Sequence, residues 1–156
     1  AIAEYGKYNI FSPDRTHKIK AEIFARGPVA AGVNAEPLVH YEGGIVNDTA
    51  VWNMMVNHIV SIVGWGTDEE TGDQYWIVRN SWGQYWGELG YFRILLGHNS
   101  LGIESEVAWA TPGTWTVHNF PCAEDGGNCG GGPGVQHYLD PSNIITAVQA
   151  RLRGRG

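Results

Sequence analysis

The pattern of hydrophobic and polar positions predicts one helix near the start of the chain. Residues 12–14, Ser-Pro-Asp, are typical of a helix start, because Ser caps a first turn and Pro fits the first helical position. The Gly-Pro pair at 27–28 predicts the helix end. Between these signals, apolar residues recur three and four positions apart and predict the buried face: Ile19, Ala21, Ile23 and Phe24.

The rest of the first two thirds of the chain has the pattern of a sheet. Apolar and β-branched residues fill four segments, which we expect to be strands: 29–33, 56–65, 74–80 and 91–96. A polar stretch at 68–73 contains a glycine and predicts a hairpin between the second and third of them. We therefore expect an α+β fold in which one helix packs on an antiparallel sheet.

Composition changes near residue 117. Residues 122–134 are mostly Gly, Pro, Asn and acidic residues, which bury too little apolar surface to become ordered alone. Residues 142–153 have the spacing of a short helix. We interpret 1–116 as the folded part and 117–156 as a Gly-rich C-terminal extension.

The size and charge of the chain exclude some classes of function. Its 156 residues, 43% of them hydrophobic, suit a single packed domain. The formal net charge is −6, and three of the ten basic residues lie in the last six positions. So acidic a chain argues against nucleic-acid binding, which needs clustered Lys and Arg. The longest nearly apolar run, at 59–65, is far shorter than the roughly 20 residues of a membrane span.

Three smaller features bear on the cellular compartment in which the protein is made and processed. Cys122 and Cys129 lie in the Gly-rich segment and could form a local disulfide or stay reduced; their spacing decides neither. Asn47 begins an N-glycosylation sequon, Asn-Asp-Thr, which suits a secretory protein. The chain opens on Ala without a leader-like segment, so we expect that an upstream part was removed or that this is one piece of a larger product.

Two predicted strands carry polar residues at the ends remote from the hairpin. His58 lies about 11–12 residues before the centre of the turn and Asn80 about 10–11 after it, so antiparallel pairing brings them close together. An Asn carbonyl beside a His fixes the ring tautomer and leaves the other nitrogen available for proton exchange.

The residues around this pair resemble a known family. Asn-His-Ile-Val…Gly-Trp-Gly at 57–66, followed by Trp-Ile-Val-Arg-Asn-Ser-Trp-Gly-x-x-Trp-Gly-Glu-x-Gly-Tyr at 76–91, is similar to the C-terminal half of papain-like cysteine proteases (peptidase family C1), which include the cathepsins. The segments at 21–28 and 41–45 match in the same order. The resemblance implies a papain-like C-terminal, or right-hand, domain: an antiparallel sheet or barrel with a packed helix.

The resemblance also implies roles for individual residues. His58 would pair as general base with a cysteine thiolate, Asn80 would accept a hydrogen bond from its ring, and Trp82 would form the active-site wall that covers this bond. Four positions are implied to act in substrate binding, the first three in the main specificity pocket: Gly32, Val56, Ile59 and Asn57. No cofactor is implied, and the other histidines lack metal-ligand spacing.

One part of the family's machinery is missing from this sequence. The family's nucleophilic Cys lies roughly 130–150 residues before its His and Asn, whereas no Cys precedes His58. Cys122 and Cys129 follow the matching segment, and we expect neither to be the nucleophile. The chain alone is expected to be inactive, because His58 then has no thiol to activate.

Three hypotheses follow from the sequence. The chain is the His/Asn-bearing half of a lysosomal or secreted cysteine protease, completed by an N-terminal half that carries the Cys and hydrolysing peptides through a thioester. Alternatively it is a catalytically inactive homologue that acts as a structural or interaction subunit of a larger assembly, or an autonomous secreted binding module. The first two hypotheses predict a protein partner, because half of a two-domain fold leaves its domain-facing surface exposed.

Overall fold

The computed structural model describes residues 2–116 and 135–137. The helix predicted at 142–153, both cysteines and most of the predicted extension lie outside the described residues. Contacts divide the chain into two units, Gly6–Trp109 and one that combines residues 1–5 with 110–156. In the second unit, β8 (Thr114–Thr116) pairs antiparallel with β9 (Val135–His137).

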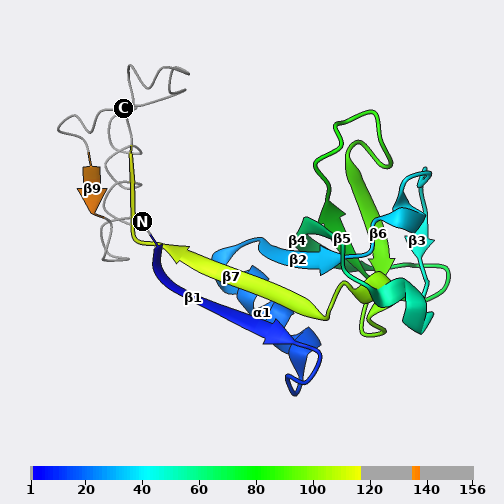
Figure 1. Ribbon diagram of the computed structural model, residues 1–156, viewed down its shortest axis with the longest axis horizontal. Helices are drawn as coiled ribbons and strands as arrows, with labels where there is room; N and C mark the ends of the chain where they lie inside the picture. Colours follow the sequence, from blue (N-terminus) through cyan, green and yellow to red (C-terminus); the bar gives the residue numbers. More distant parts are fainter. Residues whose placement is uncertain (1, 117–134, 138–156) are drawn as a thin grey trace. The chain divides into compact units, whose positions relative to one another are not determined.

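A mixed seven-stranded sheet forms the framework of the described fold (Figure 1), with strand order β1-β7-β2-β4-β5-β6-β3. The strands β2, β4, β5 and β6 pair antiparallel, as predicted, whereas the two-residue β3 runs parallel to β6. The α+β class predicted from the sequence is confirmed. The strand bounds are β1 (Ile2–Asn9), β2 (Val29–Val33), β3 (Ile45–Val46), β4 (His58–Thr67), β5 (Gln74–Arg79), β6 (Tyr91–Leu95) and β7 (Glu106–Pro112).

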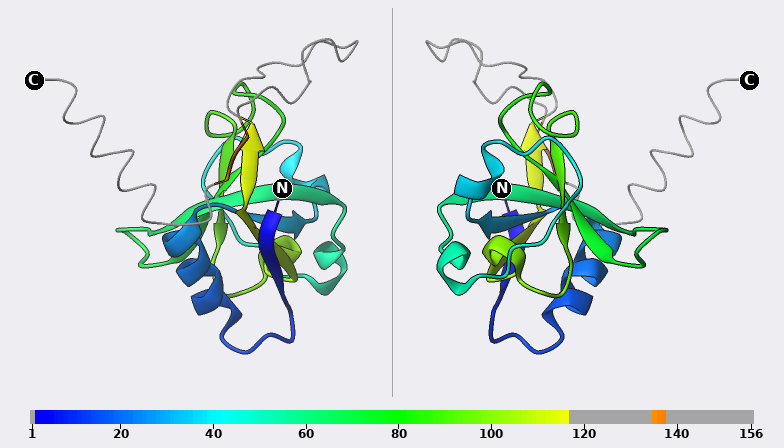
Figure 2. Two further views of the ribbon diagram at one scale, coloured as in Figure 1. Left: turned by 90° about the vertical axis from the view of Figure 1, so that its left-hand side faces the viewer. Right: turned by 90° about the vertical axis from the view of Figure 1, so that its right-hand side faces the viewer.

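The single α-helix of the described residues, α1 (Arg15–Arg26), lies against β4 and β2 (Figures 1 and 2). It buries Ile19 and Ile23, as the periodicity predicts. Phe24 is 86% exposed and Ala21 is exposed as well, so the predicted apolar face was too broad by these two residues. Three-residue and four-residue spacing defines a stripe on a helix, and tertiary contacts decide how much of that stripe is covered.

The start of the helix differs from the prediction. Asp14, with φ of 52°, occupies the cap position, and its side chain makes no capping hydrogen bond. The hydroxyl of Ser12 instead accepts a hydrogen bond from the Asn9 backbone N–H at 3.0 Å. The expected cap was wrong because a local turn engages this side chain first, a competition typical of Ser.

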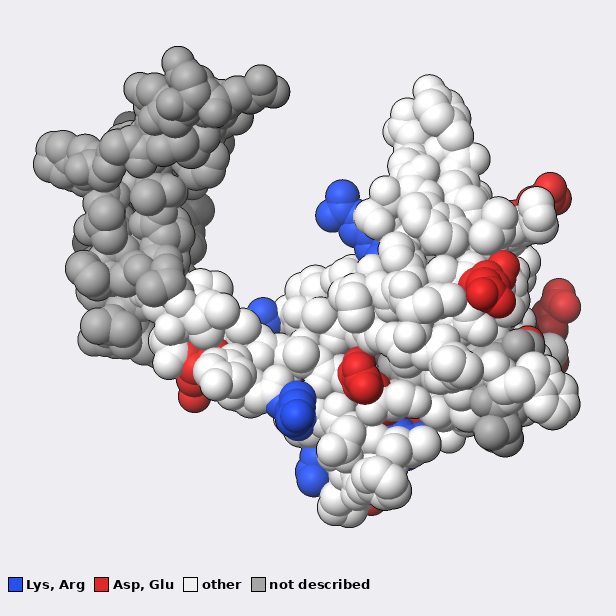
Figure 3. Space-filling model, in the orientation of Figure 1, with Lys and Arg blue, Asp and Glu red and all other residues white. Residues whose placement is uncertain are grey.

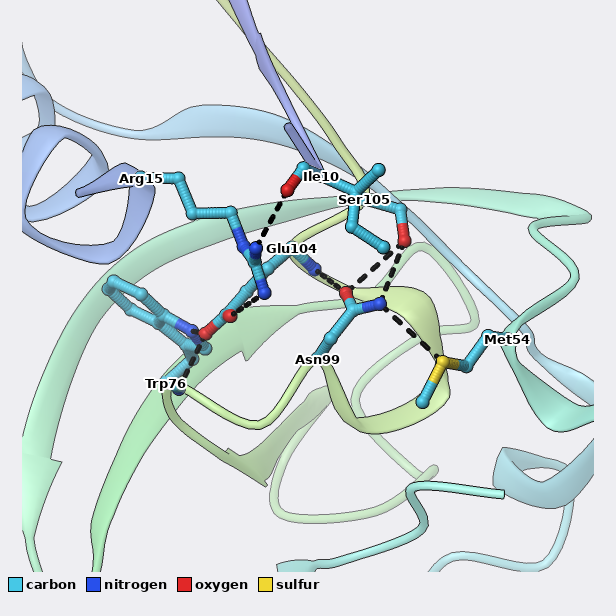
Figure 4. Close-up of polar contacts among 8 residues, drawn as sticks. Ile10, Arg15, Met54, Trp76, Asn99, Glu104 and Ser105 are labelled. Atoms are coloured by element: carbon cyan, nitrogen blue, oxygen red, sulfur yellow. Dashed lines mark hydrogen bonds and ion pairs between the residues drawn. The ribbon is translucent and has the colours of Figure 1, made fainter. Parts of the chain in front are cut away.

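A buried carboxylate joins the helix start to the sheet (Figure 4). Glu104 is fully buried and accepts hydrogen bonds from Trp76 Nε1 at 2.9 Å and the Gly97 N–H at 2.6 Å. Its other oxygen is paired with Arg15 Nη2 at 3.3 Å. Because a buried charge is tolerated only when it is paired and hydrogen-bonded, these three donors explain how Glu104 can lie in the core. The apolar core also draws residues from α1, β2 and β7, and β4, β5 and β6 contribute Val60, Ile62, Trp76, Val78, Phe92 and Ile94.

On the face drawn in Figure 3, acidic and basic side chains are scattered over a mainly uncharged surface. None of the helices in the described part of the chain is long and apolar enough to span a bilayer.

Candidate active site

The hairpin of β4 and β5 brings His58 and Asn80 together. His58 is the first residue of β4 and Asn80 follows the last residue of β5. The antiparallel register pairs Ser61 with Arg79, so both residues lie at the end of the hairpin remote from its turn. The distance from His58 Nε2 to Asn80 Oδ1 is 2.9 Å, a hydrogen bond. The predicted proximity of the two residues is confirmed.

The surroundings of Asn80 determine which ring nitrogen carries the proton. Asn80 Oδ1 also accepts the backbone N–H of Ser81 at 2.8 Å, and a backbone N–H can only donate. The side-chain oxygen must therefore face His58, and Nε2 of the ring must be the donor. Nδ1 is left as the nitrogen that can accept a proton from another group. Asn80 is itself held in place, since it is 8% exposed and its N–H bonds to the Gly90 carbonyl at 2.9 Å.

Two tryptophans pack in a row beside this pair, and only the first of them contacts His58. The ring of Trp82 stacks on His58 with centroids 5.2 Å apart and an interplanar angle of 28°. Trp86 packs edge-on against Trp82 at 5.0 Å and anchors itself by donating from Nε1 to the Leu38 carbonyl at 3.1 Å. Apolar rings lower the local dielectric and thereby strengthen the hydrogen bond that they cover. The role of Trp82 as an active-site wall stays a prediction.

Two of the predicted substrate-binding residues, Gly32 and Ile59, lie beside this pair. Gly32 is paired with Ile59 across β2 and β4, one position from the pairing of Val33 with His58. A Cβ on Gly32 would lie 2.5 Å from Cγ1 of Val56, so any larger residue here requires the side chain of Val56 to move.

A groove runs past these two residues. Its volume is about 380 Å³, and its lining combines the two strands with the edge of the sheet. The 62% exposed side chain of Ile59 offers it an apolar wall. Val56 packs behind Gly32 and is not among the lining residues, which are Lys7, Tyr8, Asn9, Ala30, Ala31, Gly32, Ile59, Glu106, Val107 and Ala108.

The side chain of Asn57 is engaged in the fold. Its Oδ1 accepts the Ala35 N–H at 2.8 Å, and its Nδ2 donates to Asn34 Oδ1 at 3.1 Å. These bonds connect the residue before His58 to the turn that follows β2. An influence of Asn57 on the site through its neighbour His58 stays a prediction.

The remaining predicted positions are Asn47 and the two cysteines. Asn47 is exposed, as an acceptor for a glycan must be. Cys122 and Cys129 lie outside the described residues. Within the part of the chain that the structure describes, no three His, Cys, Asp or Glu side chains are arranged to hold a metal ion.

The sequence analysis did not predict an ion pair between the loop that carries the tryptophans and β6. Glu88 pairs with Arg93 Nη2 at 2.7 Å, and the guanidinium holds the pKa of the Glu88 carboxyl below its usual value. A signal was present, because Glu88 belongs to the Trp-Gly-Glu-x-Gly-Tyr block that carries the resemblance. No motif in the sequence indicated that Lys7 and Glu106 line the groove.

Comparison with known proteins agrees with this geometry. The sequence pattern predicts likeness to cathepsin X, also called cathepsin Z, and a cathepsin Z of Onchocerca volvulus is 47% identical over 104 residues, covering 62% of this chain and 33% of that protein. A gut-specific cysteine proteinase of Caenorhabditis elegans is 44% identical over 96 residues, covering 61% of this chain and 28% of that protein. This chain spans about a third of the length of these curated relatives.

Solved structures give the same result. The structure of digestive procathepsin L 3 from the larval midgut of Tenebrio molitor matches with a TM-score of 0.59 and 35% identity, over 69% of this chain and 35% of that one. Bromelain from Ananas comosus, solved with the E64 inhibitor, matches with a TM-score of 0.59 and 29% identity, over 70% and 50%. The family model for papain family cysteine proteases matches residues 1–111. The chain therefore belongs to the papain family of cysteine proteases.

Proposed function

We propose that this chain is the His/Asn-bearing half of a papain-like cysteine protease. It hydrolyses peptide bonds when an N-terminal half, carrying the nucleophilic Cys, completes the site. The observation that carries this proposal is the hydrogen bond from His58 Nε2 to Asn80 Oδ1 under the ring of Trp82. It fixes the imidazole with Nδ1 available to a thiol.

The proposed reaction uses His58 first as a base and then as an acid. Nδ1 takes the proton of the Cys thiol, and the resulting thiolate attacks the carbonyl carbon of the scissile peptide bond. The C–N bond breaks as the imidazolium returns this proton to the leaving amine, which produces a thioester. Water, deprotonated by His58, then attacks the thioester, and the thiol leaves with the proton. Asn80 keeps the ring oriented throughout.

We propose that a side chain of the peptide substrate occupies the groove beside Gly32 and Ile59. Ile59 supports contact with an apolar side chain, while Lys7 and Glu106 give the groove one group of each charge. The groove adjoins the strand that begins at His58, so a side chain held there places the following peptide bond near the imidazole.

We propose that the partner covers exposed apolar surface on this half. Large apolar side chains that are at least 46% exposed occur before α1 and just before β4: Ile10, Phe11, Trp52 and Met55. Burial of such surface stabilises association by about 25 cal/mol per Å² before its costs. By analogy with the family we place the protein in the lysosome or outside the cell, and the exposed sequon at Asn47 is compatible with either.

Peptide hydrolysis by the native polypeptide or complex that contains this chain tests the proposal. We expect cleavage of fluorogenic peptide amides, with kcat/KM reduced at least about 10³-fold in a His58→Ala variant, since the loss of a general base disables the nucleophile. His98→Ala is the matched control, because His98 is exposed and outside the site. A folded native complex without activity or a reactive thiol would favour the alternative, an inactive homologue that serves as an interaction subunit.

A further inference from the structure

The loop that carries Trp82 and Trp86 is held in an unusual backbone conformation. It occupies residues 81–90, between β5 and β6, and is closed by the hydrogen bond from the Gly90 N–H to the Trp86 carbonyl at 2.8 Å. Gly83, Gly87 and Gly90 all have positive φ, and so does Leu89, at 56°. A non-glycine residue in this region is strained and persists only where surrounding contacts hold it. Backbone hydrogen bonds within the loop supply part of these contacts, and the side chain of Glu88, the neighbour of Leu89, supplies others.

The carboxylate of Glu88 joins three segments of the chain. It accepts from Arg93 Nε at 3.0 Å and Nη2 at 2.7 Å, a two-pronged pair with β6. It also accepts the backbone N–H of Gly44, at 3.1 Å, from the turn before β3. Charge-assisted hydrogen bonds with this fork geometry are the stronger and more directional kind. The guanidinium lowers the pKa of Glu88 and the carboxylate raises that of Arg93, so both groups are charged at neutral pH.

Tyr41 extends this connection to the tryptophans. Its hydroxyl donates to the Gly44 carbonyl at 2.7 Å and accepts the Arg93 N–H at 3.2 Å. Its ring lies 5.6 Å from Trp86, and a Cβ on Gly87 would lie 3.0 Å from Tyr41 Cδ1. Burial raises the pKa of Tyr41, which keeps the hydroxyl protonated and able to donate. The turn bound by Glu88 therefore also holds the ring against which Trp86 packs.

We propose that Glu88 is a positioning residue of the active site: by binding Arg93 and Gly44 together, it holds the 81–90 loop so that Trp82 lies over the hydrogen bond between His58 and Asn80. The path is short, because Trp86 contacts Trp82 at 5.0 Å and Trp82 contacts His58 at 5.2 Å. Glu88 touches neither the imidazole nor a substrate and acts only through the tryptophans.

Imidazole NMR of the full 156-residue chain tests the proposal. Glu88→Gln keeps the size of the side chain but loses the charge that both donors face. We expect solvent exchange of the His58 Nε2 proton to rise about tenfold, which equals about 1.4 kcal/mol of lost protection, while the amides of β4 and β5 keep their protection. The matched control is Glu70→Gln, an exposed glutamate in the turn between β4 and β5.

The outcomes separate a positioning role from a purely structural one. Unchanged Nε2 proton exchange in a folded Glu88→Gln variant would overturn the proposal. If that variant does not fold, Arg93→Lys, which keeps the charge but loses the fork, is expected to raise exchange by a smaller factor, and no rise would overturn the proposal as well. The proposal rests on the proposed function in one respect only, that the hydrogen bond between His58 and Asn80 serves catalysis. The exchange measurement needs no peptidase activity, so a chain that proves inactive still gives a clear result.

Discussion

Removal of Arg15 tests how the buried carboxylate of Glu104 is compensated. The side chain of Arg15 is 21% exposed, whereas that of Glu104 is fully buried. At their separation of 3.3 Å and an effective dielectric constant of about 20, the attraction is about 5 kcal/mol. Arg15→Met removes this attraction but leaves two hydrogen bonds to the carboxylate, from Trp76 and Gly97. We therefore expect a loss of about 3 kcal/mol in the free energy of unfolding, at the lower end for a broken buried pair.

Urea denaturation of the chain, followed by Trp fluorescence, measures this loss. With a slope of about 1.5 kcal/mol per molar, the midpoint should fall by about 2 M. Lys18→Met is the matched control, since Lys18 is exposed on the same helix, and we expect a change within about 0.5 kcal/mol. The double variant Arg15→Met/Glu104→Gln should be less destabilised than the sum of the two single variants, because it leaves no buried charge unpaired.

Two results would refute this reasoning. One is an Arg15→Met variant that loses less than about 1 kcal/mol, which would mean that water or the remaining donors solvate the carboxylate. The other is full additivity of the two substitutions, which would mean that Arg15 and Glu104 act independently.

Three further predictions concern the ion pair, the groove and the sequon. The pKa of Glu88 is lowered in the fold from its usual value of 4.5, so its stabilising contribution is complete above that pH and is lost as the pH falls through the lower folded value. The difference in unfolding free energy between the native chain and Glu88→Gln should shrink below about pH 4.5, and a constant difference from pH 7 to pH 3 would contradict this. Gly32→Val should cost about 1–3 kcal/mol by overpacking against Val56 and should raise KM of the assembled enzyme; urea denaturation and kinetics that match the native protein would disprove the close packing. Expression through a secretory pathway should place a glycan on Asn47, seen as a mass decrease on deglycosylation that Asn47→Gln abolishes, and an unmodified native Asn47 would disprove it.

The sequence predicts those parts of the fold that depend on neighbouring residues. The hairpin of β4 and β5 joins strands only a few residues apart, so the runs of β-branched residues, the composition of the turn and the residue counts on each side of it were sufficient to place His58 beside Asn80. The strands of that hairpin end within two residues of their predicted bounds. The same local logic failed at Ser12, where a turn on its N-terminal side competes for the hydroxyl.

Contacts between residues remote in sequence could not be predicted in this way. Glu104 is buried because Arg15, 89 positions earlier, reaches it, and no local pattern distinguishes it from an exposed glutamate. The hydrogen bond from the Gly44 N–H to Glu88 spans 44 positions, and no local pattern predicts it either. Adjacency in sequence also does not predict where a side chain points. Asn57 directly precedes His58, yet its side-chain amide is hydrogen-bonded to the turn after β2.

The central claim, that His58 activates a thiol from outside these 156 residues, is tested most directly by covalent labelling. The native polypeptide or complex is treated with an epoxysuccinyl inhibitor, and the modified residue is located by mass spectrometry. We predict one labelled Cys, in a segment that precedes this chain or in a bound partner, with labelling reduced at least about 10²-fold in His58→Ala because the thiolate is then lost. Labelling that is absent, or that is unchanged in His58→Ala, would contradict the claim.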